Sequence, residues 1–149
     1  MIRGTRHVGF TVRNLERSIA FYSEALGLEV TSRIEGPKEY HADVLGYPHV
    51  HLRVAFLAVP SGPAIELIEY IDPEPTSQSM ETYAVGNGHI CFLVEDVEDS
   101  ARRLVNHGAT ARSEGPVLIT SGPNKGVRVM FLRDPDGISI ELYQAPENK

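Results

Sequence analysis

Two histidines and two glutamates stand at matching places in two similar stretches of this 149-residue chain. The four residues are His7, Glu66, His89 and Glu141. Two imidazole nitrogens and two carboxylate oxygens form a donor set that suits a borderline or harder divalent ion, such as zinc, nickel, cobalt, manganese or iron(II). The residue types therefore predict one divalent metal ion per site, provided that the fold brings the four side chains together.

The matching places come from an internal repeat, which fixes the architecture before any single propensity is used. It aligns residues 7–18 with 89–100, 53–57 with 128–132, and 65–67 with 140–142. The offset is 82 in the first pair (89 minus 7) and 75 in the other two (128 minus 53), so the first half is longer. Part of this excess is expected between Glu35 and His51, a stretch without a counterpart downstream.

Each half has the same order of predicted elements, namely a strand, a helix and three further strands. Alternating residues predict the first strand, and Asn14 and Gly27 are typical of the start and the end of the helix that follows. The further strands are expected at residues 29–34, 50–59 and 64–70, and at 110–113, 127–132 and 139–143. The sequence thus predicts a single α+β domain of two βαβββ modules, about residues 5–71 and 87–145, joined by a linker at about 72–86.

Strand alternation predicts that the four candidate ligands share the sheet face without helices. Ile65 and Leu67 must face the helix, so Glu66 between them points the other way. The solvent face of a one-sided sheet would carry such polar residues without any metal. The symmetric placement of all four favours a shared metal site over that alternative.

Several motifs resemble the vicinal oxygen chelate superfamily, which includes glyoxalase I, methylmalonyl-CoA epimerase, type I extradiol dioxygenases, and bleomycin and fosfomycin resistance proteins. The motifs are His7-Val8-Gly9-Phe10-Thr11-Val12, Leu15, Phe21-Tyr22, Leu26-Gly27-Leu28, Gly88-His89-Ile90 and the run from Asp134 to Leu142. The resemblance spans nearly the whole chain. It implies that the paired modules form a cupped mixed sheet around a divalent metal, with the four candidate ligands at the family's ligand positions.

The resemblance also implies a reaction class. In the family's extradiol dioxygenases the position of Glu66 is not a ligand, so a glutamate there favours the lyase and isomerase branch. By analogy, a metal-bound carbonyl loses a proton from its neighbouring carbon, and Glu141 or Glu66 is the base. Two alternatives stay open, an iron(II) extradiol-type dioxygenase and a non-catalytic protein that binds a small molecule, as resistance proteins do.

The substrate is not fixed by these motifs, because the chain departs from each relative it resembles. Glyoxalase I enzymes typically carry an arginine at the position of Thr11, where it holds the glutathione carboxylate, so this chain disfavours a glutathione thiohemiacetal. Methylmalonyl-CoA epimerases usually have glutamine at the position of Glu66 and a His-Pro pair near Arg133 and Asp134. A neighbouring branch that acts on another metal-chelating small molecule is therefore expected.

Three further groups of residues have side chains suited to catalysis or to substrate binding. His41, His49 and His51 line a substrate pocket, supply an acid or base near neutral pH, or belong to a solvated loop. Arg53 and Arg128 are expected to pair with acids rather than to bind an anionic substrate. Cys91 is expected to be part of a pocket wall and not a nucleophile, since no partner histidine is evident from its spacing.

Composition and charge limit the partners. Fourteen Lys and Arg against 20 Asp and Glu give a net charge of −6, which disfavours nucleic acid as a partner. No apolar run approaches the roughly 18 residues of a membrane span, and the single cysteine agrees with a reducing compartment. A cytoplasmic protein with a small-molecule substrate is expected, and a homodimer that covers open sheet edges.

Overall fold

A computed structural model describes residues 1–146 of the chain. The chain divides into two compact units, of which unit 1 is Met1–Ser77 and unit 2 starts at Gln78. Each unit has a sheet of its own, with helices on it or at its end. The division falls within residues 72–86, and a single domain made of both units stays a prediction. From residue 1 to 146, no helix is long and apolar enough to cross a membrane.

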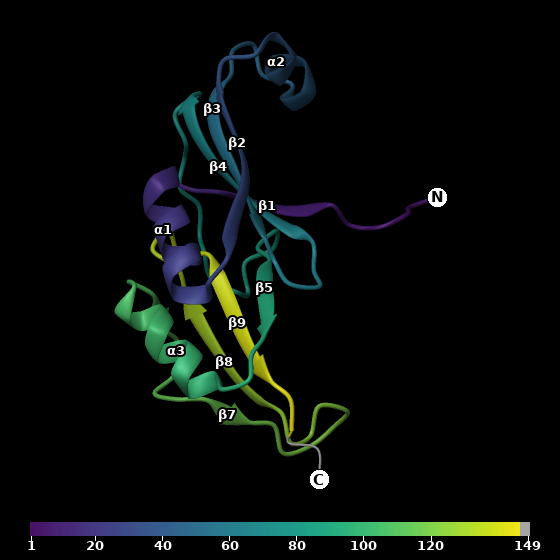
Figure 1. Cartoon of the computed structure of the whole chain (residues 1–149), viewed down its shortest axis with the longest axis vertical. Helices are drawn as coiled ribbons and strands as arrows, with labels where there is room; N and C mark the ends of the chain where they lie inside the picture. Colours follow the sequence, from purple (N-terminus) through teal and green to yellow (C-terminus); the bar gives the residue numbers. More distant parts are fainter. Residues whose placement is uncertain (147–149) are drawn as a thin grey trace. The chain divides into compact units, whose positions relative to one another are not determined.

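Unit 1 contains a four-stranded sheet in the order β1-β4-β3-β2. Its elements are β1 (His7–Thr11), α1 (Leu15–Leu26), β2 (Glu29–Gly36), α2 (Glu39–Leu45), β3 (His51–Ala58) and β4 (Ala64–Asp72). β1 runs parallel to β4, and the other neighbours are antiparallel. Figure 1 shows α1 beside the sheet and α2 at the end where β2 leads over to β3.

Unit 2 repeats this plan with a sheet in the order β5-β9-β8-β6, and β7 also pairs with β8. Its elements are β5 (His89–Leu93), α3 (Val97–Asn106), β6 (Thr110–Ala111), β7 (Val117–Leu118), β8 (Arg128–Arg133) and β9 (Ser139–Gln144). β5 is parallel to β9, as β1 is to β4 in unit 1. The predicted α+β class and the repeat are thus confirmed.

Both units depart from a plain βαβββ order at one point. In unit 1 the excess segment contains α2, a helix that the sequence analysis did not predict. The segment has no counterpart in the other half, so the repeat gave no guide to its structure. In unit 2 the strand expected at 110–113 is reduced to β6, and β7 supplies a second short strand beside β8.

The predicted helix boundaries follow from capping. The Asn14 side chain accepts a hydrogen bond from the Arg17 backbone N–H at 2.9 Å, and Asp96 accepts one from the Asp99 N–H at 2.8 Å. Each bond satisfies one of the free N–H groups at a helix start. Gly27 ends α1 at φ 70°, in the left-handed region that a side chain disfavours.

Alternation along the strands separates the face that packs on a helix from the opposite face, where the candidate glutamates stand. Ile65 and Leu67 in unit 1, and Ile140 and Leu142 in unit 2, are fully buried, as predicted for the face that packs on α1 or α3. Alternation places Val8 of β1 on the same face, but Val8 is 37% exposed, because β1 is an edge strand of its sheet. The opposite face, here called the open face, therefore carries Glu66 and Glu141.

Candidate active site

In unit 1 the structure brings His7 and Glu66 together on the open face. The Nε2 atom of His7 lies 3.2 Å from Oε2 of Glu66. His7 stands on β1 two residues before Gly9, which is the register partner of Glu66 on β4. An added Cβ at Gly9 would lie 3.1 Å from Glu66 Oε2, so the missing side chain leaves the carboxylate free to reach His7.

In unit 2 the same register joins His89 to Glu141. Their Nε2 and Oε2 atoms are 3.1 Å apart. Cys91 takes the place of Gly9 as the partner of the glutamate. Burial raises the pKa of the Cys91 thiol to about 11, and the charge of Glu141 and a hydrogen bond to it add to this rise. A thiol with this pKa stays protonated at neutral pH, which disfavours Cys91 as a nucleophile, whereas its place in a pocket wall stays a prediction.

A phenylalanine completes each pair. The Phe56 ring meets the His7 ring edge to face with centroids 5.5 Å apart, and Phe131 meets His89 at 5.3 Å. Phe56 is the register partner of Glu66, and Phe131 that of Glu141. Such contacts restrict the orientation of an imidazole ring. The sequence analysis gave these rings no role, although their offset of 75 (131 minus 56) within the repeat is a signal that could have found them.

The donor spacing within each pair fits a divalent cation. Bonds of about 2.1 Å at right angles place two neighbouring donors about 3.0 Å apart. The observed separations of 3.2 and 3.1 Å are close to this value. In the part of the chain that the structure describes, no three His, Cys, Asp or Glu side chains gather into a metal-binding group. A site built from the pair of each unit therefore stays a prediction.

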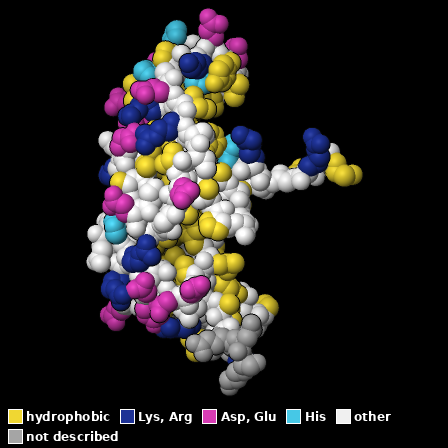
Figure 2. Space-filling view, in the orientation of Figure 1, with side chains coloured by type: hydrophobic (Ala, Val, Ile, Leu, Met, Phe, Trp, Pro, Cys, Tyr) yellow, Lys and Arg dark blue, Asp and Glu magenta, His cyan; other side chains and the backbone are white. Residues whose placement is uncertain are grey.

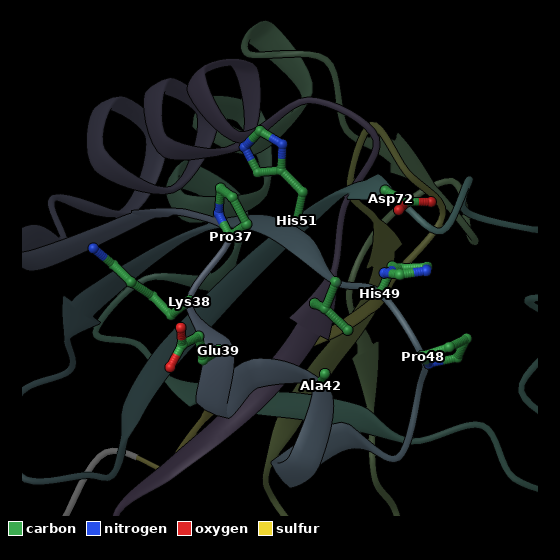
Figure 3. Close-up of a pocket in the computed structure, with 9 residues that line it drawn as sticks. Pro37, Lys38, Glu39, Ala42, Pro48, His49, His51 and Asp72 are labelled. Atoms are coloured by element: carbon green, nitrogen blue, oxygen red, sulfur yellow. The ribbon is translucent and has the colours of Figure 1, made fainter.

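The three histidines of the excess segment lie in different surroundings. His41 is on α2 and is buried, whereas His49 precedes β3 and His51 begins it. His49 lies outside the strand that His51 begins, and Figure 3 shows the two rings pointing in different directions. Both line a pocket of about 510 Å³, together with Pro37, Lys38, Glu39, Ala42, Pro48, Val50 and Asp72.

The two equivalent arginines pair with acids of their own unit. Arg53 contacts Glu69 at 3.2 Å and Glu16 at 3.1 Å, and Arg128 contacts Glu98 at 2.7 Å. Glu16 and Glu98 are themselves equivalent in the repeat, so each unit ties its helix to its sheet by the same ion pair. The pairing interpretation thus agrees with the structure.

The contacts of Glu16 with arginines predict a lowered pKa for its carboxyl group. A hydrogen bond from Arg33, and then the charges of Arg33 and Arg53, lower the pKa of Glu16 below its ordinary value. The ionised form is therefore favoured by folding, and this small stabilisation is lost as the pH falls through the folded-state pKa. Removing the donor in Arg33→Ala should raise the Glu16 pKa, measured by NMR titration of its carboxyl carbon. Arg102→Ala in unit 2 is the control, and an unchanged Glu16 pKa in Arg33→Ala would contradict the assignment.

Comparison with known proteins identifies the family. A model of the Glyoxalase/Bleomycin resistance protein/Dioxygenase superfamily matches residues 6–131. This chain belongs to that superfamily. The matched range contains His7, Glu66 and His89, while Glu141 lies just beyond it. The resemblance to vicinal oxygen chelate proteins is thereby confirmed.

The relatives include lactoylglutathione lyases and an epimerase. Lactoylglutathione lyase of Salmonella typhimurium is 31% identical over 146 residues, which cover 95% of this chain and 92% of that enzyme. A 2-epi-5-epi-valiolone epimerase from an Actinomyces species is 27% identical over 143 residues, or 94% of this chain and 78% of that one. A glyoxalase family protein from Bacillus cereus, known from a crystal structure, is 26% identical in sequence to this chain. The two structures superpose with a TM-score of 0.85, over 98% of this chain and 96% of that chain.

Proposed function

We propose that this chain is a divalent-metal-dependent lyase or isomerase of the glyoxalase type, which moves a proton on the carbon next to a carbonyl group of a small molecule. The observation that carries the proposal is the duplicated His–Glu pair, which has the same strand register and a neighbouring phenylalanine in each unit. The relatives support it, since one is named a lactoylglutathione lyase and another an epimerase.

In this proposal His7, Glu66, His89 and Glu141 hold one divalent ion. Their two nitrogens and two oxygens are compatible with zinc, nickel, cobalt, manganese or iron(II). When bound, such an ion polarises the substrate's carbonyl group and stabilises the negative charge that grows on its oxygen.

The proton transfer itself falls to a glutamate of this chain. The side chains of Glu66 and Glu141 are only 18% and 19% exposed, so little water competes with the substrate for either carboxylate. Each glutamate stands within a strand, which fixes its backbone while the side chain can still rotate. Either one can take the proton from the carbon and return it to the substrate, which is general base and then general acid catalysis.

The test is a measurement of metal and of proton exchange on the full chain. Protein purified without chelator should contain about one divalent ion per chain by mass spectrometry. In D₂O the protein should also incorporate deuterium into adducts of 2-oxoaldehydes with thiols, at the carbon next to the carbonyl group. NMR detects this deuterium. Metal without exchange, but with oxygen consumption on catechols, would favour the dioxygenase. Ligand binding without metal would favour a small-molecule-binding or resistance protein.

Thr11 predicts that the protein does not prefer glutathione over a smaller thiol in such adducts. Thr11 lies on β1, and its uncharged side chain cannot form an ion pair with a carboxylate. The thiohemiacetals of methylglyoxal with glutathione and with 2-mercaptoethanol should therefore give kcat/KM values within about threefold of each other. Steady-state kinetics would decide, and a strong preference for glutathione would contradict this expectation.

Gly9 provides a test of the metal site that uses the repeat as its own control. In Gly9→Ala the new methyl group would crowd Glu66 Oε2 and shift the carboxylate away from His7. Changes of this kind beside a metal ligand weaken metal binding about 10-fold or more. Cys91→Ser at the matching position keeps its Cβ and a group that can donate a hydrogen bond to Glu141, so it should bind metal nearly as the parent does. Calorimetric titration with Zn²⁺ compares them, and equal losses in both variants would contradict the site.

A homodimer is also part of the proposal. Within residues 1–146, β1 and β5 each stand at the edge of their own sheet, and an edge strand has backbone groups available for pairing with another chain. A second copy of the chain can cover such edges symmetrically. Light scattering coupled to size exclusion should give twice the mass of 16.4 kDa, and a monomer mass would remove this part of the proposal.

A further inference from the structure

A second pocket opens on the open face of unit 1, next to His7 and Glu66. It has a volume of about 330 Å³ and reaches from these two residues to α2. Ligand pockets of small molecules begin at about this size, and a cavity of about 150 Å³ already holds benzene. The pocket therefore has room for a bulky group of a molecule whose reacting atoms lie at the His–Glu pair.

The floor and the far wall of this pocket are apolar. Leu52 and Val54 of β3 are 5% and 4% exposed and belong to a buried cluster on the open face. Ile68 on β4 packs against this cluster, and Val44 of α2 also lines the pocket. Figure 2 shows hydrophobic side chains gathered at the end of unit 1 that bears α2. An apolar group of a ligand would lose its contact with water here, which favours binding.

Polar atoms without partners mark the same pocket. Three buried side-chain nitrogen or oxygen atoms within residues 1–146 have no hydrogen-bond partner, and two of them are the Nδ1 atoms of His7 and His41. Both residues line the pocket. His41 is only 6% exposed, and its ring is held edge to face against Tyr40 at 4.5 Å. A buried polar atom without a partner destabilises the protein, and a ligand that satisfies it regains that energy.

We propose that this pocket is the subsite for the substrate's side chain and that His41 Nδ1 forms a hydrogen bond with a hydroxyl or carbonyl oxygen on it. The substrate class is then a 2-oxo compound whose apolar side chain, of about six to eight carbon atoms, carries one polar group at its far end. The chemistry of this class rests on the proposed function, whereas the binding of the side chain does not. The described part of unit 2, residues 78–146, has no counterpart of α2, so the subsite belongs to unit 1.

The test uses p-cresol and toluene as probes, because they differ only by the hydroxyl group. Calorimetry on the full chain as purified should show p-cresol binding about 10-fold more tightly than toluene, as expected for one hydrogen bond in a buried site. In ¹⁵N NMR spectra p-cresol should shift the His41 ring nitrogens of the unmodified protein, which needs no variant. His41→Leu should remove the preference, and His41→Asn, whose amide can occupy the place of Nδ1, should retain it.

His51→Leu is the matched control in the neighbouring pocket and should leave the preference unchanged. Equal binding of the two probes, no binding, or a preference that survives in His41→Leu would overturn the subsite. Kinetic assays separate this result from the proposed function. If the chain fails to exchange protons but still prefers p-cresol through His41, the reaction is wrong and the subsite stands. If it exchanges protons on methylglyoxal adducts without that preference, only the subsite is wrong.

Discussion

Glu141→Gln is expected to lower kcat/KM for proton exchange by about 10²- to 10⁴-fold, and Glu66→Gln is expected to show which of the two glutamates is the base. Glutamine keeps the size of the side chain but cannot accept a proton from carbon. It also remains a weak oxygen ligand, so part of the metal should be retained. The glutamate that acts as base should therefore lose activity beyond any loss of bound metal.

The measurement is deuterium exchange by NMR at saturating metal, with metal content determined on the same samples. Glu29→Gln is the control, because Glu29 is an exposed strand glutamate on β2, which β3 separates from β4 in the sheet of unit 1. Activity of both site variants within about threefold of the parent would exclude either carboxylate as the base. Loss of metal in both, without any difference between them at saturating metal, would assign them a role in binding alone.

The paired site could be predicted from sequence because two independent patterns agree there. The repeat makes His7 equivalent to His89 and Glu66 to Glu141, and strand alternation puts each of them opposite the buried residues. Neither pattern depends on the exact ends of an element. The separations of about 3 Å within each pair follow from the parallel register of the first and last strands, which the topology fixes.

The segment that contains α2 could not be predicted in this way. It occurs once, so no second copy indicates which of its residues matter. Local signals were present, since Tyr40 and Val44 are four residues apart and Gly46 follows at φ 73°. They are weak, because Lys38 at the helix start forms no side-chain capping bond. His41 is buried and lines a pocket together with residues of β3 and β4, which are distant in sequence, and only the folded chain shows this.

Leu142→Ala is expected to lower the free energy of unfolding by about 2–5 kcal/mol, because Leu142 is fully buried and alanine leaves a cavity. Leu93→Ala is the matched control in the same sheet. Leu93 is 81% exposed on β5, so its replacement should change the free energy by at most about 0.5 kcal/mol. Urea unfolding followed by circular dichroism gives both values.

The Leu142→Ala variant also tests whether the buried face of the sheet and the face that carries the proposed metal ligand are separate. Glu141 and Leu142 are neighbours in β9, and alternation sends one to the open face and the other to the core. Leu142→Ala should therefore destabilise the fold while metal affinity, measured at a temperature where the variant is still folded, stays near that of the parent. A large loss of metal affinity with little change in stability would mean that Leu142 faces the site, and the proposed assignment of the two sheet faces would then be wrong.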